Sequence, residues 1–193
     1  MNAQRKRLLG IKLLGALLFV LMLTAQGHPN IYMDILGFLL IVASGLGRVW
    51  AASYIAGFKS GKVVQDGPYS IMRNPLYFFS FLGFAGVGLV FGSFTLAILL
   101  VGVFLVTHLP IIRYEEGKLL ELFGEEYANY KAKTPRFFPK LSLFHSPDMI
   151  DFYPKKFAKT LRESGLLIAT YGIVKLIVWM HENGILPNLI TLY

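Results

Sequence analysis

The chain has 193 residues, of which 55% are hydrophobic, and it carries 19 lysines and arginines against 11 acidic residues. This apolar share exceeds that of an ordinary soluble domain, and the length suits one domain. The absence of cysteine excludes disulfides, thiolate metal sites and cysteine nucleophiles. A net charge of +8 is typical of proteins that bind nucleic acid or an anionic membrane surface. Long apolar runs favour the membrane, so no nucleic-acid partner is expected.

Five segments are apolar and long enough to cross a bilayer. We expect them near residues 8–26, 31–57, 75–92, 94–112 and 160–181. The first follows basic residues but lacks a small-residue cleavage site, so we interpret it as a retained helix and not a signal peptide. The sequence therefore predicts an all-α integral membrane bundle with about five transmembrane helices and a cytoplasmic amphipathic helix. We treat residues 1–193 as a single membrane domain.

Basic residues gather on one side of these segments. That side holds, among others, Arg5, Lys6, Arg7, Lys59, Lys62, Arg73, Arg113, Arg136 and Lys140. The loops near residues 26–30 and 92–94, and the chain after residue 182, carry no lysine or arginine. The positive-inside rule then places the amino terminus in the cytoplasm and the carboxyl terminus on the opposite side.

The first polar segment, residues 57–77, joins the second apolar segment to the third. Gly67 allows a backbone to approach a ligand closely, and Pro75 suits the first turn of a helix. Asn74 is a natural N-cap with Arg73 beside it, and a helix N-terminus next to an arginine attracts a carboxylate or phosphate. The alternative is a well-capped helix with an arginine at the membrane interface.

The second polar segment, residues 113–140, contains a stripe at helical spacing. Its members are Glu116, Leu119, Phe123, Tyr127 and Tyr130. Spacings of three and four place them on one face. An amphipathic helix on the membrane surface would explain this stripe. Its polar side is mostly acidic, which favours a helix folded over the end of the bundle and covering a pocket. The adjacent carboxylates of Glu115 and Glu116 would attract a cation.

Together the two segments supply an arginine, a helix N-terminus, carboxylates, aromatic rings and exposed backbone. A ligand with an amino-acid group, a positive centre and a purine would use all of them, and S-adenosylmethionine is such a ligand. NADPH would use the arginine and the helix terminus, but it calls for more cations around its phosphates. A membrane reductase that uses NADPH is therefore the alternative function.

Other polar residues lie within the apolar segments. Arg48 either reaches the cytoplasmic surface with its long side chain or binds an acidic lipid headgroup or substrate. Lys175 is interpreted as a snorkelling or interhelical residue. The four histidines show no spacing typical of metal ligands, so no metal is expected.

A pattern of fixed positions runs from about residue 48 to residue 140: Val64, Gly67, Tyr69, Arg73, Pro75, Tyr77, Glu115, Glu116, Leu119, Phe123, Gly124, Tyr127, Tyr130, Arg136 and Pro139. This pattern resembles the isoprenylcysteine carboxyl methyltransferase family and its relatives among the membrane phospholipid methyltransferases. The resemblance implies transfer of a methyl group from S-adenosylmethionine to a lipid or isoprenoid-linked acceptor that enters from the bilayer, with a carboxylate favoured. The helix expected over residues 158–182 lies beyond the pattern. The family usually has a histidine where this chain has Asn74.

The resemblance also implies a site, with residues 57–77 and 113–140 as its cofactor-binding segments. The cofactor is expected to contact Lys62, Val63, Val64, Tyr69, Arg73, Asn74, Pro75, Leu76, Tyr77 and Glu115. Catalytic roles are expected for Glu116, Arg113 and Arg136, with Glu116 as the base for an uncharged amine. Arg48 and Arg113 are expected to bind an acidic substrate. The identity of the acceptor and the oligomeric state stay open.

Overall fold

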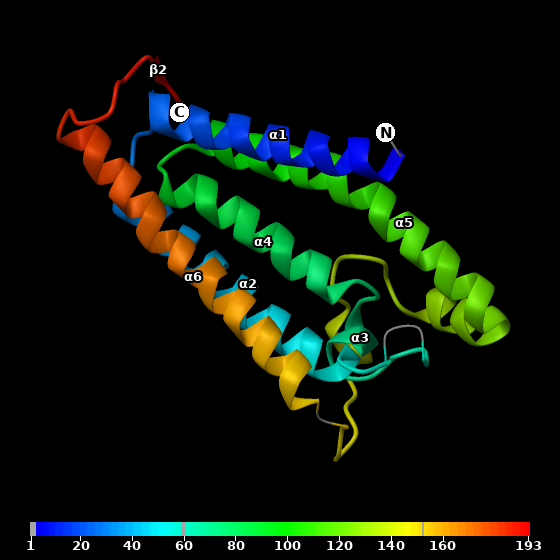
Figure 1. Ribbon diagram of the computed structural model, residues 1–193. Coiled ribbons are helices and arrows are strands. Elements are labelled where there is room, and N and C mark those ends of the chain that lie inside the picture. Colours follow the sequence, from blue (N-terminus) through cyan, green and yellow to red (C-terminus); the bar gives the residue numbers. More distant parts are fainter. Residues whose placement is uncertain (1–2, 59–60, 152) are drawn as a thin grey trace. The chain divides into compact units, whose positions relative to one another are not determined.

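The computed structural model describes residues 3–58, 61–151 and 153–193 (Figure 1). Lys59 lies outside the described residues, as do the side chains of Arg5, Lys6 and Arg7. The elements in chain order are α1 (Ala3–Thr24), β1 (Ala25–Gln26), α2 (Ile31–Ile55), α3 (Pro68–Ile71), α4 (Pro75–Val90), α5 (Phe94–Lys133), the 3-10 helix η1 (Leu141–Leu143), α6 (Pro154–Glu182) and β2 (Ile190–Thr191). The prediction of an all-helical chain is confirmed.

Within the described residues, three helices are long and apolar enough to cross a membrane. They are α2, α5 and the part of α6 from Phe157 to Glu182. Helix α4 has 16 residues and spans roughly 24 Å, which is shorter than a typical bilayer core. The chain is therefore consistent with an integral membrane protein, while the count of five spans stays a prediction.

The chain divides into two compact units, which we describe in turn. The first unit comprises Met1–Ile41, Phe84–Thr107 and Ala169–Tyr193, and the second comprises Val42–Gly83 and His108–Ile168. Helices α2, α4, α5 and α6 contribute residues to both units.

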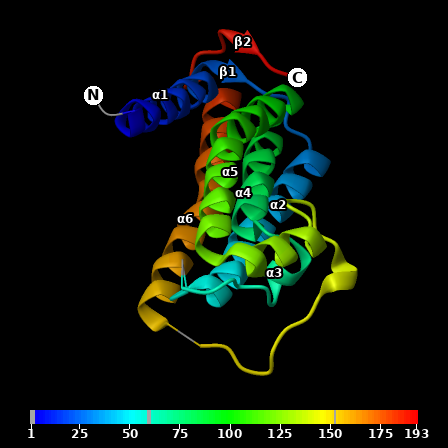
Figure 2. The same cartoon turned by 90° about the vertical axis from the view of Figure 1, so that its right-hand side faces the viewer.

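In the first unit the last residues of the chain pair with the end of α1 (Figure 2). Strands β1 and β2 are parallel, with Ala25 opposite Ile190. The Tyr193 carbonyl accepts hydrogen bonds from Ser93 Oγ at 3.1 Å and from the Thr95 amide at 2.7 Å. Nothing in the sequence pattern predicted this clasp, because two-residue strands leave no periodic signal.

Close helix packing in the first unit depends on glycine. A Cβ atom on Gly86 of α4 would lie 2.7 Å from the Gly37 carbonyl oxygen of α2, and a Cβ atom on Gly37 would lie equally close to the Gly86 carbonyl oxygen. Small residues allow such close backbone contact between membrane helices. An ion pair also joins α2 to α6, since Lys175 Nζ lies 3.1 Å from Asp34 Oδ2. Lys175 is therefore an interhelical residue.

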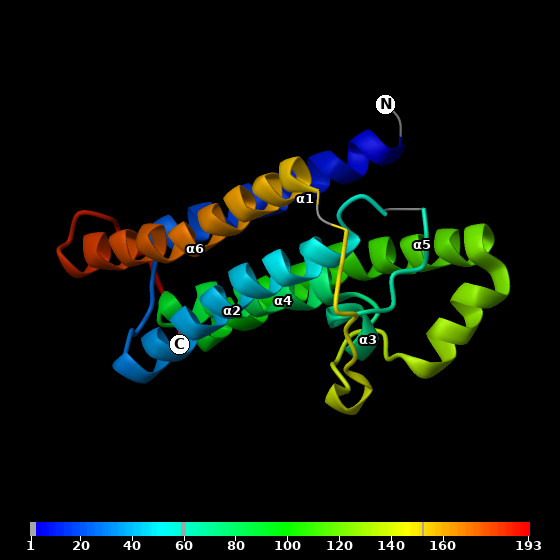
Figure 3. The same cartoon turned by 90° about the horizontal axis from the view of Figure 1, so that it is seen from below.

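In the second unit α5 differs from the expected pair of helices. We expected a span ending at residue 112 and a separate amphipathic helix, but α5 runs without interruption through Pro110 and both glutamates. Most residues between Pro110 and Gly124 favour helix, and propagation of an existing helix is inexpensive. The break comes at Gly124, whose φ of 49° suits glycine. The last turns fold back after it (Figure 3).

Replacing Gly86 with alanine tests the close contact between α2 and α4. The added methyl group has no space, so Gly86→Ala should lower the free energy of unfolding by about 1–3 kcal/mol. Gly102→Ala is the matched control, because nothing lies within 4 Å of a Cβ atom at that helical position. Thermal unfolding in detergent measures both variants. Equal melting temperatures for the two variants would contradict the packing argument.

Candidate functional site

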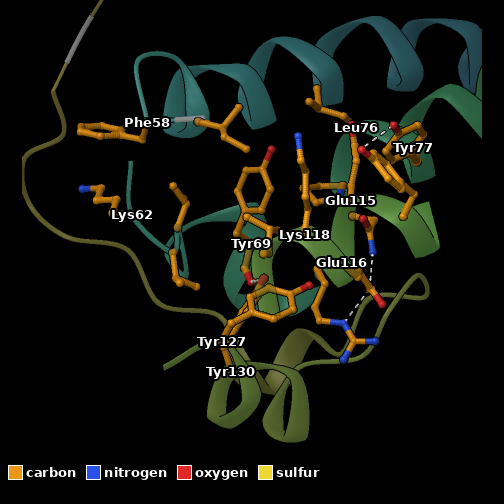
Figure 4. A pocket seen from close by; sticks show the side chains of 18 of the residues that line it. Phe58, Lys62, Tyr69, Leu76, Tyr77, Glu115, Glu116, Lys118, Tyr127 and Tyr130 are labelled. Carbon is orange, nitrogen blue, oxygen red and sulfur yellow. Dashed lines mark hydrogen bonds and ion pairs between the residues drawn. The ribbon is translucent and has the colours of Figure 1, made fainter. Parts of the chain in front are cut away.

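The second unit contains a cavity of about 550 Å³ (Figure 4). Its wall is built from α2, the stretch around Val63, α3, α4 and α5. This volume falls in the range of small-molecule sites in proteins. All ten positions expected to contact the cofactor line it: Lys62, Val63, Val64, Tyr69, Arg73, Asn74, Pro75, Leu76, Tyr77 and Glu115. Arg48 and Glu116 line it too.

Glu116 of α5 is the centre of a buried ion cluster at the wall of the cavity. Its side chain is 4% exposed. Arg73 Nε and Asn74 Nδ2 donate to Oε1 at 3.1 and 2.9 Å. Arg136 lies against Oε2, with Nε at 3.0 Å and Nη2 at 2.9 Å. Both carboxylate oxygens are therefore occupied by donors, which makes Glu116 a connector between segments and a poor candidate for a catalytic base.

The cluster also fixes the start of α4. Arg73 Nη1 donates to the Lys131 carbonyl at 2.7 Å, and the Arg73 amide donates to the Pro135 carbonyl at 2.9 Å. The Asn74 side-chain amide donates its second hydrogen bond to the Arg136 carbonyl at 3.0 Å. We expected Asn74 to cap α4 with its side chain. Its backbone carbonyl instead accepts the first helical bonds, from Tyr77 and Phe78, while the side chain is used by the ion cluster.

Glu115 sits beside the cluster in a different environment. A helix turns about 100° per residue, so Glu115 faces the cavity at a different angle from Glu116. Tyr77 Oη donates to Glu115 Oε2 at 3.0 Å, and the Tyr77 ring lies 5.8 Å from that of His108. Glu115 is only half-buried. It is therefore a carboxylate, oriented by Tyr77, that lines the cavity.

Tyr69 presents a buried hydroxyl with no hydrogen-bond partner among the described residues. Gly67, with φ of 58°, begins the turn into α3, and Tyr130 Oη donates to the Tyr69 carbonyl at 2.7 Å. The side chain is 5% exposed, and its hydroxyl points into the cavity (Figure 4). Burial raises the pKa of Tyr69, helped by the nearby Tyr130, Glu115 and Tyr77. An unpaired buried hydroxyl costs about 1–3 kcal/mol, so this position is suited to donate to a ligand.

Arg48 also reaches this cavity from α2. Its Nη1 donates to Ser80 Oγ at 2.5 Å, and Ser80 Oγ donates to the Leu76 carbonyl at 2.8 Å. Arg48 is therefore held by α4, and it supplies a cation to the cavity wall.

Two of the expected site residues do not line the cavity. Arg113 is exposed, because it lies two residues before Glu115 and so points to nearly the opposite side of α5. Arg136 is half-buried behind the wall, where it pairs with Glu116.

Sequence reasoning missed several lining residues, namely Ile55, Phe58, Ser80, His108, Tyr114, Lys118 and Leu122. Helical spacing from expected site residues could have identified two of them, Ser80 and His108. Ser80 follows Leu76 by one turn, and His108 precedes Glu115 by two turns. No group of three or more histidine or acidic side chains suited to a metal ion occurs within the described parts of the chain.

Comparison with known proteins gives one family model and two curated relatives. A family model described as phospholipid methyltransferase matches residues 32–126. The cobalt-zinc-cadmium resistance protein CzcN of Cupriavidus metallidurans is 32% identical over 157 residues, covering 81% of this chain and 72% of that protein. The nickel-cobalt-cadmium resistance protein NccN of Alcaligenes xylosoxydans xylosoxydans is 35% identical over 156 residues, covering 81% and 73%. No solved structure matches the chain.

Replacing Glu116 with glutamine tests the ion cluster. The substitution leaves the buried Arg73 without its counter-charge and turns an amide group toward donors, so Glu116→Gln should destabilise the fold by about 3 kcal/mol. Glu121→Gln removes an exposed carboxylate from the same helix and is the matched control. Thermal unfolding followed by tryptophan fluorescence measures both. A melting temperature for Glu116→Gln equal to that of the control would show that the cluster contributes nothing to stability.

Proposed function

Because the chain belongs to the phospholipid methyltransferase family, we propose that it transfers a methyl group from S-adenosylmethionine to a lipid acceptor in the membrane. The observation that supports this most is the single cavity in which the ten expected cofactor positions meet. Nine of those positions lie between Lys62 and Tyr77, and the tenth, Glu115, lies 38 residues after Tyr77.

In this proposal the polar ends of the cofactor bind to different walls of the cavity. Glu115, oriented by Tyr77, accepts the ammonium group of the amino-acid part. The carboxylate of the same part faces the first turn of α4, where the helix N-terminus favours an anion. The ring of Tyr77 supplies a cation–π contact to the sulfonium. Backbone groups of Lys62, Val63 and Val64 are available to the purine edge.

Methyl transfer is an in-line displacement at carbon. A lone pair of the acceptor forms the new bond to the methyl carbon while the electrons of the carbon–sulfur bond return to sulfur, which leaves as S-adenosylhomocysteine. The protein contributes position and exclusion of water. An ionised acceptor needs no base, which agrees with the full occupancy of both Glu116 oxygens.

We assign the acidic head of the acceptor to Arg48. Of Arg48 and Arg113, the two arginines expected to bind an acidic substrate, Arg48 is the one that lines the cavity. The names of both relatives refer to resistance against divalent metals. Methylation of a lipid carboxylate would remove an anionic ligand for such cations, so we propose a carboxylate acceptor and a role in metal tolerance.

Incubation with radiolabelled S-adenosylmethionine and a total lipid extract tests the activity. We expect one labelled lipid whose methyl group is released as methanol by mild base, as for a carboxyl ester. A base-stable label would contradict the carboxylate and would point to an amine, phenol or thiol acceptor. Glu115→Gln should reduce labelling at low cofactor concentration and weaken S-adenosylhomocysteine binding about ten- to a hundredfold, since a hydrogen bond to a charged group contributes about 1.5–3 kcal/mol. Thermal stabilisation of the wild-type chain by NADPH but not by S-adenosylhomocysteine would overturn the proposal.

Tyr69→Phe tests the orphan hydroxyl as a donor to the carboxylate of the cofactor. The charge of Glu115 contributes to the raised pKa of Tyr69, so the two side chains are near each other. Glu115 is assigned to the ammonium group of the cofactor, and the carboxylate of the cofactor is attached to the same carbon atom as that ammonium. The variant should lose about two- to tenfold in affinity for S-adenosylhomocysteine, the effect of roughly 0.5–1.5 kcal/mol, and nothing for the decarboxylated analogue. Tyr32→Phe, at a position 82% exposed, is the control. An equal loss of affinity for S-adenosylhomocysteine and for its decarboxylated analogue would contradict a contact with the carboxylate. The Tyr69 hydroxyl would then bind the nucleoside.

A further inference from the structure

Residues 137–150, which we call the strap, expose an unusual number of large apolar side chains. Phe138, Leu141, Phe144 and Met149 are 70%, 73%, 54% and 88% exposed. The strap lies between α5 and α6, outside the helices that are long enough to cross a membrane. Neighbouring exposed apolar groups of this size mark an interaction surface.

The strap displays these side chains from a fixed backbone. The Lys140 amide donates to the Ile71 carbonyl at 2.9 Å, and the Gly67 amide donates to the His145 carbonyl at 2.8 Å. Both bonds tie the strap to α3 and its N-terminal turn. Leu141 and Phe144 are three residues apart at the 3-10 helix η1, a spacing that places side chains on one face. The apolar groups are therefore presented together, as a surface.

The strap also lies beside the last turns of α2. The rings of Phe144 and Trp50 are 6.3 Å apart, and the hydroxyls of Tyr54 and Ser146 are 2.7 Å apart. Trp50 and Tyr54 belong to the end of a candidate membrane span. Tryptophan and tyrosine at the end of a span favour the depth of the lipid headgroups. The contacts therefore bring the strap near that depth.

The charge around the strap is strongly basic. Between residues 131 and 162 the sequence has eight lysines and arginines but only two acidic residues. Lys131, Lys133 and Lys140 are exposed, as are Lys155 and Lys159 on the first turns of α6. Basic groups around exposed aromatic and aliphatic side chains fit an anionic lipid surface.

We propose that the strap is a binding surface for anionic lipid. Phe138, Leu141 and Phe144 enter the boundary between headgroups and acyl chains, while the surrounding lysines bind the headgroups. The contact is independent of the reaction assigned to the cavity. The strap is hydrogen-bonded to α3, the helix that carries Tyr69 of the cavity wall.

The cysteine-free chain allows a direct test by single-site labelling. Leu141→Cys is labelled with a polarity-sensitive fluorophore, and the protein is placed in nanodiscs of phosphatidylcholine with or without phosphatidylglycerol. We expect a blue shift and quenching by brominated lipid acyl chains in the anionic discs. Both should be weaker in zwitterionic discs, and should weaken at high salt or when Lys133 and Lys140 are replaced with glutamate. The same label at Phe138→Cys provides an independent second position.

Glu125→Cys on α5 is the matched control, because Glu125 is exposed and lies outside the strap. Its label should report water in every disc. Aqueous emission from positions 138 and 141 in anionic discs would overturn the proposal. So would a blue shift that follows the number of protein copies per disc and not the lipid, because a second copy would then cover the strap. Neither result depends on whether the chain binds S-adenosylmethionine.

Discussion

The geometry of the cavity depends on the burial of one carboxylate. An ion moved out of water is costly unless its charge is paired and its hydrogen-bonding positions are filled. Glu116 meets both conditions, with two arginines and an amide around it. Its partners come from the start of α4 and from the segment after α5, so satisfying this carboxylate brings those segments together. Because Arg73 and Asn74 immediately precede α4, the first turn of that helix takes its position in the wall from the same cluster.

Adjacent glutamates on one helix thereby acquire different roles. Both oxygens of Glu116 are occupied by the cluster, while Glu115 lines the cavity and accepts a hydrogen bond from the Tyr77 hydroxyl. Two neighbouring carboxylates sharing one site would repel each other. Here the turn of the helix separates them, and the arginines neutralise the inner one. The cavity therefore offers a carboxylate for a cationic ligand without the full repulsion of a pair, which suits the ammonium of the proposed cofactor.

The sequence allowed prediction of the helical class and the approximate helix positions, because apolar length leaves a local signal. The positions expected to contact the cofactor came from the family resemblance, and these positions line the cavity. Long-range features could not be predicted in this way. The pairing of Arg136 with Glu116 joins residues twenty positions apart around the break at Gly124. The orientation of Arg113 required the knowledge that α5 continues unbroken, and two-residue strands such as β1 have no periodicity to detect.

Part of the cavity wall lies beyond the stretch that the family model matches. The family model ends at residue 126, yet Tyr130 and Arg136 lie beyond it. Tyr130 lines the cavity and holds the backbone of Tyr69, and Arg136 neutralises Glu116. The part of the chain after residue 126 therefore completes a wall whose other residues belong to the matched stretch. Since loops vary more readily than a helical scaffold, changes in the loop after α5 can alter the shape of the cavity while the residues on the helices stay in place. Tyr130 and Arg136 therefore act on the cavity through Tyr69 and Glu116, two residues inside the matched stretch.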